Sequence, residues 1–135
     1  MDEDSQNALL ALQRQVEELQ ELVTMLTACV AYDAAEPYLS QQVKLNMVGP
    51  ERALTLQVIS AVLDRALGAT PQRPSSLLEQ FPAAEEAFVD QPLTAAEAIE
   101  TVARCLGVAE EVAERLLGAH RASGLHAEGH AALGR

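Results

Sequence analysis

Apolar residues recur at alternating spacings of three and four through the first quarter of the chain. This spacing predicts a helix with one continuous apolar face, on which valine follows leucine in a heptad pattern. From Val16 onward, valine occupies heptad position a and leucine occupies position d, an order that favours a parallel two-stranded coiled coil. We therefore expect the chain to form a homodimer through these residues, called the seam below: Leu9, Leu12, Val16, Leu19, Val23, Leu26 and Val30.

The positions that flank the seam carry no charge. Charged pairs at heptad positions e and g normally fix the relative direction of two helices. Here these positions hold Gln13, Gln15, Gln20, Leu22, Thr27 and Cys29. The sequence therefore leaves parallel and antiparallel association open, and the same spacing also occurs in the long helix of a monomeric bundle.

A second apolar stripe accompanies only the later part of this helix, which we expect to run from about residue 5 to residue 35. Its members are Leu22, Met25, Cys29 and Tyr32. A helix with two apolar faces has two surfaces to bury. The stripe predicts that this part packs on the rest of the chain while the seam meets a partner. Glu17, Glu18 and Glu21 lie outside the seam and are expected to face solvent.

The remaining periodicity is helical throughout. It predicts helices at about 37–47, 50–67, 95–106 and 109–121, with short turns at 75–81 and 82–88. Thr94 and Glu97 form a capping-box pattern, and the 50–67 helix is the best candidate for the centre of the core. The predicted fold class is all-α, with about five to six helices and a long N-terminal helix packed on or extending from a small bundle.

Loop-forming residues divide the chain into four parts. Residues 1–67 are expected to hold the long helix and a helical hairpin, with the dimerisation function. Residues 68–76 read as a linker or exposed loop rich in proline, serine and threonine, and 77–122 as a C-terminal helical hairpin region. Residues 123–135 are rich in glycine and alanine and are expected to be a flexible tail. Whether 68–76 separates two domains stays open.

The charge is strongly negative and lies in two blocks. The formal net charge is −11 at pH 7, and residues 1–36 and 82–118 each hold eight acidic residues, against one and two basic residues. Such a surface disfavours nucleic acid and anionic membranes and favours a protein partner with a basic surface. The exposed-face acids of the last two predicted helices are the candidate partner surface: Glu97, Glu100, Glu110, Glu111 and Glu114.

Chemical signatures are missing from the sequence. There is no nucleophile elbow, no phosphate-binding glycine loop and no cysteine pair at metal-ligand spacing, so we expect no enzyme activity, no cofactor and no metal site. His126 and His130 share a face only if the tail is helical, which leaves weak metal binding open. Two scattered cysteines, Cys29 and Cys105, and an acidic start favour the cytoplasm, and no apolar run is long enough to cross a membrane.

These observations favour a non-enzymatic, acidic helical module that acts as a homodimeric adaptor or regulator. One alternative is a dimeric DNA-binding regulator, because residues 94–121 resemble a helix-turn-helix pattern around Gly107. Its phosphate contacts would come from Arg104, Arg115 and Arg121, but three glutamates on the second helix oppose such contacts. Another alternative is an inhibitor whose acidic surface imitates nucleic acid and blocks a basic partner.

Overall fold

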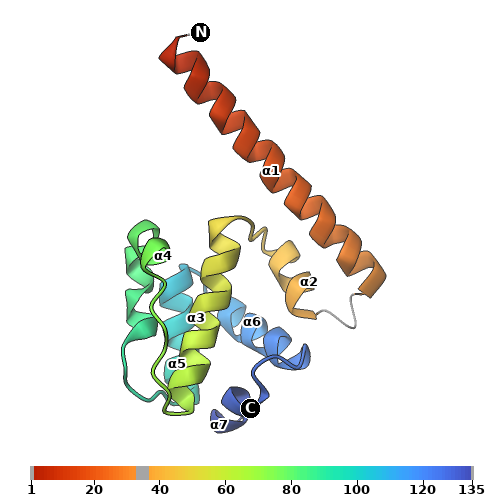
Figure 1. Ribbon diagram of the computed structural model, residues 1–135. Helices are drawn as coiled ribbons and strands as arrows, with labels where there is room; N and C mark the ends of the chain where they lie inside the picture. The colour runs from red at the N-terminus through yellow and green to blue at the C-terminus, as the bar shows by residue number, and fades with distance from the viewer. Residues whose placement is uncertain (1, 33–36, 135) are drawn as a thin grey trace.

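The computed structural model describes residues 2–32 and 37–134, except the side chains of residues 28–32. Secondary structure within these ranges is entirely helical, as the sequence predicts, and consists of one long helix and a bundle of shorter ones (Figure 1). The segments are α1 (Glu3–Tyr32), α2 (Pro37–Lys44), α3 (Pro50–Ala66), α4 (Ser75–Gln80), the 3₁₀ helix η1 (Pro82–Phe88), α5 (Ala95–Leu106), α6 (Glu110–Ala122) and α7 (Ala127–Ala132).

Helix α3 lies at the centre of the bundle, as its apolar spacing predicts. Val58, Ile59, Val62 and Leu63 are completely buried, and the helix packs against η1, α5 and α7. Pro50 occupies its first turn, where the missing N–H of proline removes no helical hydrogen bond. The sequence pattern therefore identifies both the start of this helix and its role in the core.

The segments on the two sides of the predicted 68–76 loop share one hydrophobic core. Leu63 before the loop and Leu78, Val102 and Leu116 after it belong to a single buried cluster. Arg65 reinforces this connection from α3, because its buried guanidinium donates hydrogen bonds to three backbone carbonyls around the end of η1. The chain is irregular from residue 69 to residue 74, α4 begins at Ser75, and this segment joins parts of one packed body.

The α5–α6 hairpin matches its sequence signals closely. Thr94 and Glu97 form the predicted capping box, with Thr94 Oγ1 accepting from the Glu97 N–H and Glu97 Oε1 accepting from the Thr94 N–H. Gly107 ends α5 with a φ of 65°, a left-handed conformation that glycine adopts without steric cost. Helix α6 begins three residues later and also packs against α2.

The C-terminal residues differ from the prediction of a flexible tail. Residues 127–132 form α7, which packs on α3, and His130 and Leu133 are buried. Two side-chain contacts hold this helix: His126 Nε2 lies 2.7 Å from Asp64 Oδ1, and His130 Nε2 lies 2.9 Å from His120 Nδ1. Glycine content suggested disorder, but Gly129 serves packing here, since an added Cβ would lie 2.7 Å from Leu63 Cβ.

A candidate interaction surface on the long helix

Helix α1 extends from the body, and its N-terminal end lies far from the other helices (Figure 1). It begins at Glu3, where Asp2 Oδ1 accepts a hydrogen bond from the Ser5 N–H at 2.7 Å. This start is about two residues earlier than expected, because Asp2 caps the helix. Its first 15 residues, 3–17, are all exposed.

The seam stays uncovered along its described length. Its six described side chains are between 47% and 63% exposed, a range set by Leu9 and Val23. None of the described elements of the body buries this face, and Val30 lies outside the described side chains. A continuous row of half-exposed leucine and valine is unusual for a monomeric surface, where apolar residues are normally scattered. The row is the candidate interaction surface: Leu9, Leu12, Val16, Leu19, Val23 and Leu26.

The second stripe packs on the body, in agreement with its position on the helix. Met25 is buried with 3% of its surface exposed, and Leu22 is half-buried. Cys29 and Tyr32, the other two members, lie outside the described side chains. Helix α2 supplies the main contact with this part of α1. The part of α1 that carries Met25 is therefore fixed to the body by a face other than the seam.

Glu21 corrects the expectation that the acids of α1 face solvent. Its carboxylate is half-buried and accepts hydrogen bonds from the Gly49 N–H at 2.9 Å and from Arg52 Nη1 at 3.2 Å. Gly49 precedes α3 and has no side chain with which to cap it, so a carboxylate from α1 supplies the negative charge at this helix start. Sequence reasoning missed this contact, although Glu21 lies next to the stripe residue Met25 on the helix surface.

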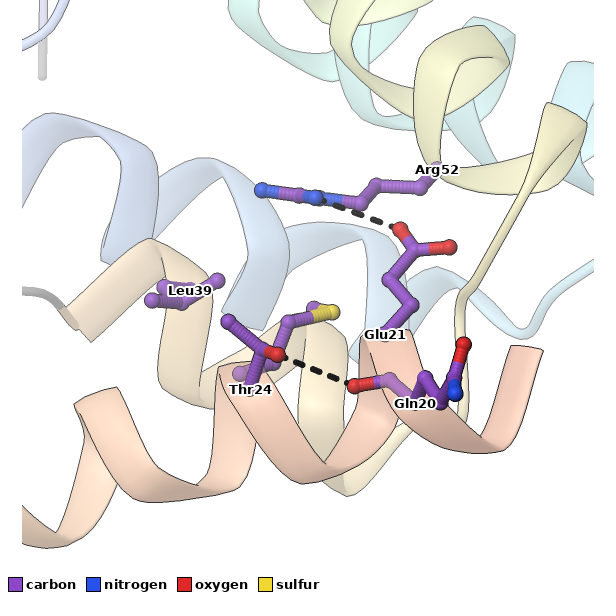
Figure 2. Close-up of a pocket in the computed structure, with 6 residues that line it drawn as sticks. Gln20, Glu21, Thr24, Leu39 and Arg52 are labelled. Atoms are coloured by element: carbon purple, nitrogen blue, oxygen red, sulfur yellow. Dashed lines mark hydrogen bonds and ion pairs between the residues drawn. The ribbon is translucent and has the colours of Figure 1, made fainter. Parts of the chain in front are cut away.

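A concavity lies where α1 meets the body, beside the seam. It has a volume of about 400 Å³ and is lined by Gln20, Glu21, Thr24, Met25, Leu39 and Arg52. Figure 2 shows the Arg52 side chain reaching Glu21 above this space, with Leu39 on the far side from Gln20. Thr24 Oγ1 donates to the Gln20 backbone carbonyl and is thus turned back onto its own helix. Its two charged lining residues, Glu21 and Arg52, pair with each other, so the space offers no site for an ionic ligand.

The five predicted acids of the second surface are all exposed, but two have structural roles. Glu97 belongs to the capping box, and Glu100 lies 3.9 Å from Arg104. Arg104 also pairs with Glu86, so this predicted phosphate-binding arginine is already held by two carboxylates. Glu110, Glu111 and Glu114 remain as an exposed acidic row on α6.

A buried cluster of Tyr38, His120 and His130 was not found by sequence reasoning. The His120 ring packs edge-on against Tyr38 at 5.0 Å between centroids, and burial lowers its pKa to about 4. Burial also raises the pKa of the Tyr38 phenol. The rings come from α2, α6 and α7, and only the three-dimensional structure brings such distant segments together. Among the residues that the structure describes, no three histidine, cysteine or acidic side chains form a group suited to a metal ion.

Cys105 on α5 is a free cysteine with a buried side chain. It is 5% exposed, and burial raises the pKa of its thiol. The side chain of Cys29, the other cysteine of the sequence, lies outside the described set. In the described parts of the chain, no helix combines the length and apolarity needed to cross a bilayer.

Comparison with known protein families, curated proteins and solved structures gives no match to this chain.

Proposed function

We propose that this protein is a non-enzymatic interaction module that forms a homodimer through the α1 seam and acts as an adaptor or regulator. The observation that carries the proposal is the uncovered row of six leucine and valine side chains from Leu9 to Leu26. Apolar surface in a continuous row is removed from water most readily by a matching row on another helix.

The size of the seam is sufficient for a weak to moderate dimer. Half-exposed leucine and valine contribute about 100 Å² each, so two seams bury roughly 1,200 Å² in total, near the lower bound for specific interfaces. The flanking glutamines Gln13, Gln15 and Gln20 add polar contacts without unpaired charge. A second copy is the simplest occupant, because it presents the same unpartnered row in the same solution.

The acidic row on α6 supports the second half of the proposal, a protein partner with a basic surface. Glu110, Glu111 and Glu114 are exposed and form no side-chain ion pair among the described residues. Dimerisation doubles this row and provides avidity toward a partner with repeated sites. We propose a cytoplasmic location, which the two scattered cysteines favour.

Two leucines of equal exposure provide a matched test. Leu19 lies in the seam and Leu10 lies outside it on the same helix, and each is 60% exposed. In sedimentation at micromolar concentration, we expect the wild type and Leu10→Glu to be dimers and Leu19→Glu to be a monomer, because the new charge is buried only at Leu19. A monomeric wild type, or an unchanged mass for Leu19→Glu, would refute the proposal.

A further inference from the structure

The proposed dimer leaves the direction of its two helices open, and the structure adds observations that bear on it. Resting on the proposed function, we infer that the two α1 helices run antiparallel. In this arrangement Leu9 of each copy lies level with Leu26 of the other. The same register places Leu12 level with Val23 of the second copy, and Val16 level with Leu19.

The first observation concerns the register. In the antiparallel pair the six described seam side chains pair completely, because each residue at heptad position a lies level with a residue at position d of the other copy. Val30, the seventh seam residue, falls level with Ser5 of the second copy. A parallel pair matches the same six positions, so the register permits the antiparallel direction and the observations below favour it.

The second observation is the charge at the helix ends. Asp2, Glu3 and Asp4 lie at the N-terminal end and are exposed, with no basic residue within the first turns. A parallel pair brings six carboxylates and two like ends of the helix dipoles together. Antiparallel pairing separates the two acidic ends by the helix length, about 45 Å, which is several times the screening distance at physiological ionic strength.

The third observation is that the two halves of α1 are supported differently. Residues 3–17 are all exposed, whereas Glu21 and Met25 fix the later half to the body. A helix of about 15 residues is marginal in water without packing. In the antiparallel pair, each unsupported half lies against a half that the other body holds in place. In a parallel pair, the two unsupported halves have only each other.

One sequence feature points the other way. Valine at position a with leucine at position d favours parallel dimers, but this preference normally acts together with charged pairs at e and g. Gln13, Gln15, Gln20 and Thr27 occupy those positions here, so they provide no such help. The end charges and the unequal support of the two halves therefore decide the direction.

Disulfide trapping tests the direction. Cys29 lies on α1, so all variants carry Cys29→Ser, while the buried thiol of Cys105 stays in place. Leu9→Cys and Leu26→Cys are purified separately and oxidised under a mild glutathione buffer, alone and after mixing to allow subunit exchange. Antiparallel pairing predicts a covalent dimer only in the mixture, because like cysteines then lie about 25 Å apart along the helices. The Cys29→Ser chain alone is the control for background oxidation.

Each outcome separates the two proposals. A covalent dimer from either single variant would show parallel pairing and overturn the inference while leaving the homodimer intact. A chain that sediments as a dimer but forms no disulfide in any sample would also overturn the register. Leu12→Cys mixed with Val23→Cys provides a second cysteine pair, in case a local distortion at Leu9 or Leu26 prevents the first disulfide. A Cys29→Ser chain that sediments as a monomer would refute the proposed homodimer itself.

Discussion

The long helix and the helical body differ in how much of their apolar surface they bury. In the body, leucine and valine are placed so that α3, α5 and α6 cover one another, and Leu116 and Leu117 are completely buried. In the seam of α1, side chains of the same two types stay about half exposed, because no described part of the chain packs over them. The comparison indicates that the body's stability is internal, whereas the seam gains stability only from another helix.

The largest expected effect is the loss of a core leucine. Leu116→Ala removes a completely buried side chain from α6, and we expect it to lower the free energy of unfolding by about 2–5 kcal/mol, because lost burial and the new cavity add together. Urea denaturation measures this change. Leu10→Ala removes the same side chain from an exposed site on α1 and should cost less than about 0.5 kcal/mol. Equal losses of stability in the two variants would contradict the contrast between the body and α1.

Protonation of His120 should weaken the body alone. This buried ring from α6 contacts Tyr38 of α2 and His130 of α7, and burial lowers its pKa from 6.5 to about 4. The unfolded chain therefore binds a proton before the folded chain does, and stability falls as the pH drops from 6.5 toward 4. We expect a loss of about 2 kcal/mol between pH 7 and pH 5, measured by urea denaturation.

A matched variant isolates the histidine. His120→Phe keeps a ring beside Tyr38 but cannot bind a proton, so its loss of stability between pH 7 and pH 5 should be smaller than that of the wild type by about 2 kcal/mol. An unchanged pH slope in this variant would mean that another group causes the loss.

Loss of the contact between α1 and the body should have a smaller effect on the free energy of unfolding. Glu21→Ala removes the carboxylate that accepts from the Gly49 N–H and from Arg52, and we expect a cost of about 1 kcal/mol because the group is only partly buried. Hydrogen exchange at the Gly49 amide should become faster. Glu17→Ala, on the exposed face of the same helix, is the control and should change neither quantity.

How far the sequence predicts the fold depends on whether a signal is local. Periodicity and capping residues located α3, α5 and α6, and the Thr94–Glu97 box formed as predicted. The two apolar stripes of α1 predicted which face meets the body at Met25. Contacts between distant segments left no periodic signal: Glu21 reaches Gly49, and His130 reaches His120. The glycine-rich C-terminus was misread for the same reason, since its order comes from packing on α3.

The last comparison is between two helix caps, one in the body and one on α1, and it includes the smallest expected effect. Thr94 caps α5 inside the body and Asp2 caps α1 at its free end, and each accepts a hydrogen bond from a backbone N–H three residues later. Thr94→Ala should lower the free energy of unfolding by about 1 kcal/mol, because α5 unfolds together with the core that it helps to form. Asp2→Ala should leave the urea midpoint unchanged and only accelerate hydrogen exchange at the Ser5 amide, since the first turn of α1 frays without disturbing any tertiary contact. If Asp2→Ala instead shifted the midpoint as much as Thr94→Ala, the free half of α1 would have to be coupled to the body's unfolding. The seam could provide that coupling only through a second copy, so the pair of variants should be compared above and below the dissociation constant of the proposed dimer.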